Sequence, residues 1–396
     1  MPDDCIPPIR IGEARVVHYR APLDTPYRTT FGAMTHRQAV VITLTTDDGV
    51  VGIAESWVNF PLWAPSERIA AFMQGYFTQI VGREITGIPR FVRGLWDSQY
   101  RAALQSATLG PALQALCAVE AALLDIEAKR RGFPLGRLFA ESPARTVKAY
   151  ASGINPPFPV DSISQALDAG IDTFKLKLGY GDDSDRENIS ALKRLLGPGV
   201  RVAVDVNRSW SFDQTLAWMD YLRDEGIAWL EEPLAIEYQH RYPELRGRAA
   251  VPVSAGENFL IQPGADFSLE GEGGLSLDST GLALDIVQPS VVKNCCFSDA
   301  VRLMELVERG CGILCPHFLG SAPGMATTAH LASLSRNPYL EWDINPNPLR
   351  TSLFREPFRI ADGFFKVSDE SGIGWMPRSD IPDAWIGYAG TVSAEK

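Results

Sequence analysis

Short apolar runs alternate with helical stretches from residue 147 onward. Helical periodicity fills residues 213 to 225 and 297 to 309, and similar stretches lie between most of the other apolar runs. Eight strands joined by short crossovers within about 200 residues fit a closed α/β barrel better than an open sheet. The predicted strands lie near residues 147–152, 172–178, 200–206, 227–231, 252–257, 283–288, 311–316 and 338–343.

The region before the barrel has a different pattern. Residues 9 to 20 and 39 to 54 have the composition of strands, and Asp48-Gly49 divides the second run into a hairpin. Residues 22 to 35 are polar and interrupted by Pro and Gly, so we expect a loop there. The same region has helical periodicity over residues 66–82, 89–105 and 111–131.

These patterns divide the chain into three parts. We predict an N-terminal α+β domain over residues 1 to 145 and a barrel over residues 146 to 350. Short strand-like pieces in residues 351 to 396 are expected to rejoin the first domain. Within the barrel, residues 264 to 281 are rich in Gly and acidic side chains with little periodicity, which predicts an irregular insertion.

Composition narrows the class of partner. The 396 residues are 45% hydrophobic and 21% charged, with a net charge of −11. An acidic chain is a poor partner for nucleic acid or an anionic membrane, because both select a basic face. No apolar run approaches the roughly 20 residues that span a bilayer, and the first residues lack the basic and apolar regions of a signal peptide. We therefore expect a cytoplasmic protein with a small-molecule ligand.

Three acidic residues recur at equal spacing. Asp205, Glu231 and Glu257 are separated by 26 residues each time, and each follows an apolar run. One strand, one helix and two loops fill such an interval, so the three carboxylates are predicted at the same end of three successive parallel strands. Converging carboxylates need a cation, and oxygen ligands without Cys or His favour Mg²⁺ or Mn²⁺ over zinc. The alternative is that each is an ordinary strand-end acid facing solvent or a salt bridge.

Lys175, Lys177, His317 and Glu341 fall at the ends of other predicted strands. The period of two in a strand places both lysines on one face, and a lysine beside a cation and another lysine can be neutral and act as a base. Such a set suits removal of the proton next to a carboxylate, with the metal neutralising the enediolate and Lys175 pairing the carboxylate. A protonated Glu341 could donate a hydrogen bond. His317 could protonate a leaving hydroxyl, return the proton on the opposite face, or be purely structural.

Residues in two predicted loops are candidates for substrate contact. Trp57, Phe60 and Trp63, with Phe31, would form an apolar wall over a pocket, which suits a compact or ring-bearing acid. Arg28 could pair a second carboxylate. The alternative is that the aromatic side chains pack against a neighbouring subunit.

The ordered set of motifs resembles the enolase superfamily and, within it, the mandelate racemase-like group. The resemblance implies a (β/α)7β barrel, a capping domain built from both termini, bound Mg²⁺, and abstraction of the α-proton of a carboxylate. It implies substrate-selecting loops at residues 22 to 35 and 55 to 63, and we expect Asn207 to contact substrate and the protein to form a homo-oligomer. The motifs are K-x-K at Lys175 and Lys177, Asp205 with Asn207, E-E-P from Glu231, G-E-N around Glu257, His317, and Glu341.

One position departs from that group. Where it carries an Asp that supports the histidine, this chain has Ser290, which cannot hold an imidazolium as a carboxylate does. Lys177 is therefore the predicted base and His317 the predicted acid of a dehydratase acting on a hydroxylated carboxylic acid. A racemase or epimerase, a cycloisomerase and a non-catalytic metal-dependent binder remain alternatives. Lys293, three residues later, is expected to face away from the site.

Overall fold

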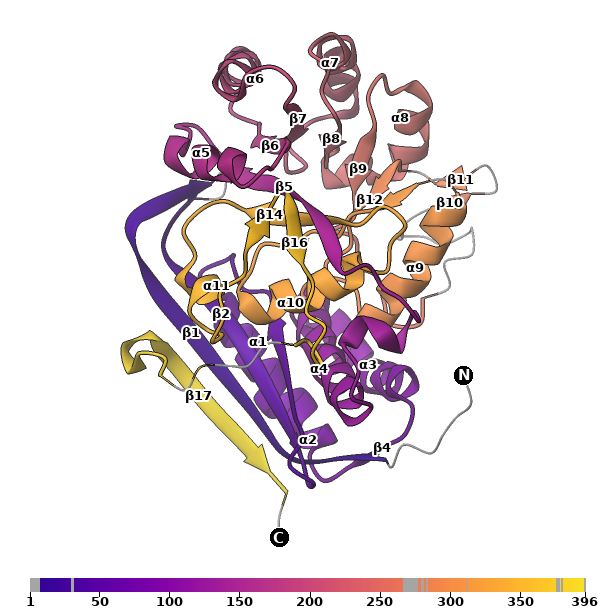
Figure 1. Ribbon diagram of the computed structural model, residues 1–396. Helices are drawn as coiled ribbons and strands as arrows, with labels where there is room; N and C mark the ends of the chain where they lie inside the picture. Colours follow the sequence, from indigo (N-terminus) through magenta and orange to yellow (C-terminus); the bar gives the residue numbers. More distant parts are fainter. Residues whose placement is uncertain are drawn as a thin grey trace.

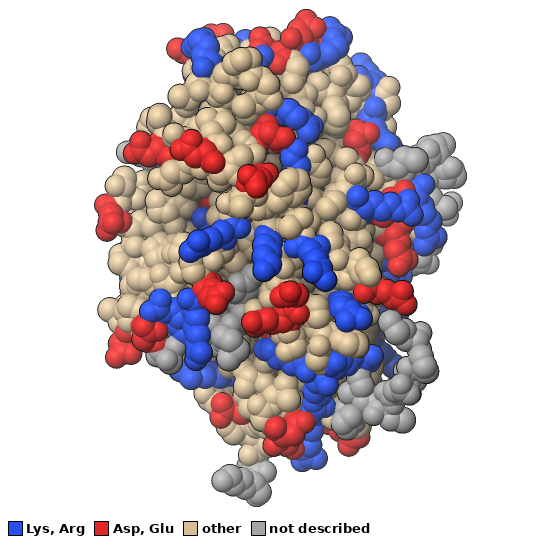
Figure 2. All heavy atoms as spheres, viewed as in Figure 1, with Lys and Arg blue, Asp and Glu red and all other residues tan. Residues whose placement is uncertain are grey.

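The computed structural model describes residues 8–29, 32–265, 277–278, 281–282, 284–310, 312–374, 378 and 380–394. It consists of a parallel barrel above a cap of antiparallel sheet and helices, with the C-terminal strand beside the N-terminal one (Figure 1). On the face shown in Figure 2, acidic and basic side chains are interspersed over the surface.

The barrel confirms the predicted (β/α)7β architecture. Its strands pair in parallel in the order β14-β5-β6-β7-β8-β9-β12-β13, and helices lie outside them (Figure 1). The strands are β5 (Thr146–Ile154), β6 (Thr173–Lys177), β7 (Arg201–Asp205), β8 (Leu230–Glu231), β9 (Val253–Ala255), β12 (Ile286–Val287), β13 (Ile313–Leu314) and β14 (Tyr339–Asp343). The helices are α5 (Val160–Asp168), α6 (Asp182–Leu196), α7 (Phe212–Asp224), α8 (Tyr242–Arg248), α9 (Phe297–Arg309) and α10 (Ala322–Ala332).

Local sequence explains where the outer helices begin and end. The Ser211 hydroxyl accepts a hydrogen bond of 3.2 Å from the Gln214 N–H and so caps α7. Helix α6 carries three acidic residues in its first turn and two basic residues in its last, which complements the helix dipole. Gly197 follows α6 with φ of +77°, a conformation that favours glycine and ends the helix.

The cap contains the predicted hairpin but extends it further than expected. Strands β1 (Ile9–Thr29), β2 (Gly32–Thr46) and β3 (Val51–Ser56) are antiparallel, and Gly49 with φ of +85° lies in the β2–β3 turn. The predicted loop over residues 22 to 35 is wrong, because β1 and β2 continue to pair through Tyr27 and Met34. Pro22 and Pro26 lie where the register shifts, so the ribbon accommodates both without interrupting the pairing.

Helices cover one face of the cap sheet. They are α1 (Ala64–Ala70), a π-helical turn (Ala71–Tyr76), α2 (Phe77–Ile80), α3 (Ile88–Gln105) and α4 (Leu109–Arg130), which confirms the three predicted helical stretches. Among the described residues, α4 is the one helix long and apolar enough to cross a membrane, but 78% of its apolar window is buried. It therefore packs as a core helix between the cap sheet and the barrel (Figure 1).

The last part of the chain contacts both regions. Strand β17 (Ile386–Ser393) pairs antiparallel with β1, whereas β15 (Ile360–Ala361) and β16 (Phe364–Lys366) extend the sheet from β5. The division at residues 145 and 350 stays our proposal. Of the predicted insertion, residues 266–276 and 279–280 lie outside the described residues, while β10 (Leu277–Asp278) and β11 (Gly281–Leu282) form a short antiparallel pair. The remaining elements are β4 (Glu84–Ile85), α11 (Pro348–Thr351) and 3₁₀ turns at Leu135–Leu138, Ile236–Arg241 and Asp383–Trp385.

A buried joint connects cap and barrel. The Glu55 carboxylate, in β3, accepts hydrogen bonds from the Ser321 N–H, the Ser321 hydroxyl and the Gly324 N–H, where α10 begins. Asp125 in α4 accepts from the Ile53 N–H at 2.9 Å and the Ile373 N–H at 2.7 Å. We use "the joint" for these two carboxylates and their partners. It fixes the cap above the mouth of the barrel.

Candidate active site

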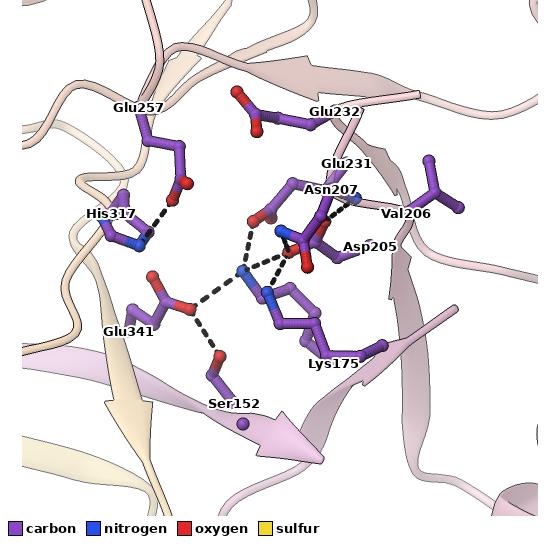
Figure 3. A network of polar contacts seen from close by, with 12 residues as sticks. Ser152, Lys175, Asp205, Val206, Asn207, Glu231, Glu232, Glu257, His317 and Glu341 are labelled. Atoms are coloured by element: carbon purple, nitrogen blue, oxygen red, sulfur yellow. Dashed lines mark hydrogen bonds and ion pairs between the residues drawn. The ribbon is translucent and has the colours of Figure 1, made fainter. Parts of the chain in front are cut away.

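Seven charged or titratable side chains meet at the carboxyl ends of the barrel strands. They come from β6, β7, β8 and β14 and from the segments that follow β9 and β13, and most of them are shown converging in Figure 3. The parallel register places Lys177 opposite Asp205, and Asp205 opposite Glu231, as the 26-residue spacing predicts. We call this group the strand-end cluster: Lys175, Lys177, Asp205, Glu231, Glu257, His317 and Glu341.

Lys175 lies at the centre of the cluster and is fully buried. Its Nζ contacts Glu231 and lies 2.9 Å from Glu341 Oε1 and 3.7 Å from Asp205 Oδ2 (Figure 3). Burial alone lowers the pKa of Lys175, but these three carboxylates outweigh it and raise the pKa well above its usual value. Lys175 is therefore a fixed positive charge.

Lys177 lies one step further along β6 and reaches the cavity. Its Nζ pairs with Asp205, whose other oxygen accepts the Asn207 N–H at 2.8 Å. Burial lowers the pKa of Lys177, but the nearby Asp205 carboxylate has the larger effect and raises it. The sequence predicted that a lysine here could be neutral, but in this arrangement Asp205 favours the charged form of Lys177.

Glu231 and Glu232 are buried side by side at the end of β8. Glu231 Oε2 accepts from Gln288 Nε2 at 2.7 Å and from Trp229 Nε1 at 3.2 Å. Glu232 Oε2 accepts from Asn258 Nδ2 at 2.7 Å, while its Oε1 is buried and has no hydrogen-bond partner within the described ranges. Burial raises the pKa of each glutamate to about 8. Sequence reasoning missed Glu232, although its place in the E-E-P motif was a signal.

Glu257 follows β9, the strand that pairs with β8, and lies beside His317 (Figure 3). Its Oε2 is 2.5 Å from His317 Nε2, and its Oε1 is 3.2 Å from Lys293 Nζ. Burial opposes ionisation, but His317 and Lys293 hold the pKa of Glu257 well below its ordinary value. His317 Nδ1 and the Ser290 hydroxyl are both buried and have no hydrogen-bond partner in the part of the chain that the structure describes, so the imidazole is held from its Nε2 side.

Lys293 faces the site, so the prediction that it faces away is wrong. That prediction assumed a continuing strand, but β12 ends at Val287 and residues 291–294 form a turn, where Asn294 N donates to Ser290 O at 3.0 Å. Lys293 Nζ donates to Asn258 Oδ1 at 2.8 Å and lies 4.7 Å from the centre of the Trp57 ring. The alternation of side chains in strands does not apply to a turn.

Glu341 accepts hydrogen bonds and does not donate one here. Its oxygens accept from the Ser152 hydroxyl and, at 2.9 Å, from the Phe318 N–H, besides pairing with Lys175. Burial opposes the charge, but Lys175 and His317 lower the pKa of Glu341 to about 2. A protonated Glu341, which the sequence left open, is not the state that this structure favours.

A cavity of about 340 Å³ opens above the cluster. Trp57 and Phe60, two of the predicted substrate contacts, line it, whereas Trp63 does not and is 65% exposed at the start of α1. Phe31 and the side chain of Arg28 lie outside what the structure describes. Lining residues that sequence reasoning did not name include Tyr27, Thr29, Arg68, Gln114, Ser152, Gly153, Asn155, Asn258 and Leu319, with Lys177, Asn207, Glu257, Lys293, His317 and Glu341 completing the wall.

The carboxylates suit a divalent cation by their chemistry. Asp205, Glu231 and Glu257 supply hard oxygen donors, and Glu232 Oε1, which has no hydrogen-bond partner among the described residues, is a further oxygen beside them. Within the described ranges, however, no three acidic, His or Cys side chains are arranged as a metal site, because Lys175, Lys177 and His317 now pair with these oxygens. The donor set therefore fits Mg²⁺ or Mn²⁺, provided that these pairs rearrange.

Comparison with known proteins gives consistent matches along the chain. The chain is 26% identical over 368 residues to D-galactarolactone cycloisomerase from Agrobacterium fabrum, covering 89% of this chain and 92% of the relative. It is 25% identical over 358 residues to arabinonate dehydratase from Saccharolobus solfataricus, covering 88% and 91%. A solved mandelate racemase/muconate lactonizing enzyme from Bordetella bronchiseptica RB50 superimposes with a TM-score of 0.81 at 26% identity, covering 94% of this chain and 98% of that one.

Family models account for both parts of the fold. Residues 11–139 match the mandelate racemase/muconate lactonizing enzyme N-terminal domain, and residues 160–266 and 279–381 match the enolase C-terminal domain-like model. With the barrel, the cap and the strand-end cluster, these matches show that the chain belongs to the mandelate racemase/muconate lactonizing enzyme family of the enolase superfamily.

Proposed function

We propose that this protein is an enzyme that removes the α-proton of a hydroxylated carboxylic acid and eliminates water from it, as an acid-sugar dehydratase does. The observation that carries the proposal is that Lys177 and His317, from distant barrel strands, line one cavity above Asp205, Glu231 and Glu257. Two relatives act on sugar acids or their lactones by name, which supports this substrate class.

The residues take distinct roles in the proposed reaction. Once Lys175 is released from Glu231 and Lys177 from Asp205, Lys175, still held by Glu341, pairs with the substrate carboxylate, and neutral Lys177 Nζ accepts the proton from the α-carbon. The C–H electron pair moves first into the carboxylate to give the enediolate and then forms the double bond to the β-carbon, as the β-hydroxyl leaves as water with a proton from His317. Because the substrate also carries an α-hydroxyl, the product is an enol. The resulting enol tautomerises to a 2-keto acid. Mg²⁺ held by Asp205, Glu231 and Glu257 would supply positive charge beside the developing enediolate and replace the lysine and histidine partners of those carboxylates.

The nature of the histidine pocket favours elimination over racemisation. A racemase needs a second base, and the base strength of a histidine is raised by an acceptor on its other nitrogen. His317 Nδ1 has no such partner, and Ser290 replaces the acid expected there. Racemisation or epimerisation is therefore the second candidate, and cycloisomerisation, the activity in the name of one relative, is the third.

The wider setting of the protein stays a prediction from its sequence. We propose a cytoplasmic protein that assembles as a homo-oligomer, with no nucleic acid or membrane as partner, and with Mg²⁺, or Mn²⁺ in its place, as cofactor. The net charge of −11 supports the absence of polyanionic partners.

Proton NMR in D₂O tests the function directly. The protein with Mg²⁺ is incubated with hydroxy acids, sugar acids and amino-acid derivatives, beside a Lys177→Ala variant. We expect deuterium at the α-carbon and a 2-keto product from a sugar acid, both lost in the variant. Inversion without loss of hydroxyl would indicate a racemase instead, and no exchange with any acid would favour a metal-dependent binder.

A further inference from the structure

The wall of the cavity opposite the strand-end cluster comes from the cap and contains unsatisfied polar atoms. The side chain of Arg68 in α1 is 3% exposed, and its Nε has no hydrogen-bond partner among the residues that the structure describes. Gln114 in α4 is 8% exposed, and its Oε1 is likewise buried without a partner. The Trp57 Nε1 donor is also unpaired. All three residues line the same cavity as Lys177 and His317.

Such atoms are costly unless a ligand satisfies them. A buried donor or acceptor without a partner destabilises the folded protein, and a charged group does so more strongly. Arg68 Nη1 is 2.5 Å from Glu67 Oε2, but Glu67 is 38% exposed and approaches only that edge of the guanidinium. Burial also lowers the pKa of Arg68, which shows how little solvent compensates its charge. The edge that includes Nε remains for a ligand.

We propose that the substrate is a hydroxylated dicarboxylate whose second carboxylate binds at Arg68, with Gln114 and Trp57 contributing further polar contacts. This inference rests on the proposed function, which assigns the first carboxylate to Lys175 and the metal. A guanidinium edge matches the two oxygens of a carboxylate, whereas a terminal hydroxyl would leave the Nε edge of Arg68, which Glu67 does not reach, without a charged partner. The sequence suggested Arg28 for this role, but the side chain that the structure places on the cavity is Arg68.

The two named relatives do not decide the question, because one acts on the lactone of a diacid and the other on a monoacid. The charges that line the cavity on its cap side do distinguish a diacid from a monoacid. Among the described lining residues, Arg68 is the cation that the cap contributes, and Lys293 lies on the barrel side. A monoacid would place its terminal hydroxyl against Arg68, and a diacid would place a charge there.

Binding measurements separate this subsite from the chemistry. Galactarate and galactonate, which differ at the terminal carbon, are titrated calorimetrically into Mg²⁺-loaded Lys177→Met protein, which on the proposed mechanism binds without turnover. We expect galactarate to bind about 30-fold more tightly, Arg68→Gln to abolish that ratio while changing galactonate affinity less than about threefold, and Arg68→Lys to restore part of it. Arg90→Gln, an exposed arginine of α3, is the matched control and leaves the ratio unchanged.

The possible outcomes distinguish the proposed subsite from the proposed function. Equal affinity for the two acids, binding of neither, or an equal loss of both affinities in Arg68→Gln would overturn it, and a general folding defect gives the last of these patterns. If diacid selectivity depends on Arg68 but wild-type protein exchanges no α-proton, the subsite stands and the proposed function fails. If exchange occurs with both acids at the same kcat/KM, the function stands and the subsite fails.

Discussion

Buried carboxylates serve two different purposes in this molecule. At the joint, Glu55 and Asp125 accept backbone N–H groups from segments far apart in the chain. Glu55 makes no ion pair among the described residues, and Asp125 adds one ion pair, with Lys129 Nζ at 2.7 Å, to its backbone contacts. In the strand-end cluster, Glu231 and Asp205 pair with lysine ammonium groups. Backbone donors cannot leave without unfolding a segment, whereas a side-chain cation can swing away. The joint is thus built to persist and the cluster to exchange its partners.

The joint and the strand-end cluster also differ in how their carboxylates are satisfied. Glu231 and Glu232 lie next to each other, each with a pKa raised to about 8 by burial and by neighbouring acids. Such repulsion is tolerated only where a ligand relieves it. At the joint, three contacts from Ser321 and Gly324 satisfy Glu55 within the protein. Substitutions should therefore damage activity in one region and stability in the other.

The largest expected effect follows from Glu231→Gln. This change removes a predicted metal ligand and keeps the shape of the side chain, so we expect α-proton exchange to fall by about 1,000-fold or more. In EDTA the free energy of unfolding should fall by less than in Glu55→Ala, because Lys175 keeps Asp205 and Glu341 as partners when the Glu231 carboxylate is lost. NMR exchange rates and urea unfolding measure the two quantities. A large loss of stability with normal exchange would contradict the comparison.

Glu55→Ala should show the opposite behaviour. It leaves the Ser321 N–H, the Ser321 hydroxyl and the Gly324 N–H buried without their acceptor, so we expect about 3 kcal/mol less stability in urea unfolding. Exchange per folded molecule should fall less than about tenfold, since no group of the cluster is removed. Glu55→Gln, which keeps one acceptor, is the intermediate control. Exchange lost as completely as in Glu231→Gln, with unchanged stability, would place Glu55 in the chemistry.

Much of this arrangement could be predicted from the sequence. The barrel, the hairpin and the positions of Asp205, Glu231 and Glu257 follow from local periodicity and from the repeat of one strand and one helix, which operate over about 26 residues. The ordered motifs also sufficed to identify the family. These features depend on short stretches of chain, so a single sequence carries them.

The rest depends on contacts between distant segments. Arg68 and Gln114 reach the cavity only because the cap folds over the barrel mouth, more than 60 residues before Lys177 in the sequence. Trp63 was expected beside Trp57, but the chain turns into α1 at that point and directs it to solvent. The turn that brings Lys293 into the site likewise has no periodic signal. Tertiary placement decides each of these three cases.

Mg²⁺ should stabilise the protein through the cluster and not through the joint. Binding to the folded state alone adds about 2.7 kcal/mol when the free ion is at 100 times its Kd. We expect this increase in the wild type and in Glu55→Ala, and its loss in Glu257→Gln, as measured by urea unfolding with Mg²⁺ or EDTA. An equal Mg²⁺-dependent increase in the free energy of unfolding of Glu257→Gln would show that the ion binds elsewhere.

The last prediction concerns how acid changes the stability of the joint. His330, on the α10 helix that Glu55 caps, is buried and contacts Ile373 O at 3.3 Å, and Ile373 N in turn donates to Asp125. Burial lowers the pKa of His330 from 6.5 to about 4, so the unfolded chain binds a proton before the folded one does. The contribution of neutral His330 is therefore fully present above pH 6.5 and is lost as the pH falls toward 4. The loss should reach up to about 1.4 kcal/mol per pH unit.

His330→Gln keeps a side-chain N–H for Ile373 and cannot titrate, so its stability should fall less steeply between pH 6.5 and 4.5 than that of the wild type. Urea unfolding at several pH values measures the difference in slope. His240→Asn, a change at an exposed histidine, is the matched control and should follow the wild type. If the stability of wild type and of His330→Gln falls equally with pH, other groups bind the protons that destabilise the fold. The carboxylates of the strand-end cluster would then be the place to look, and the division between a persistent joint and an exchangeable cluster would not extend to protons.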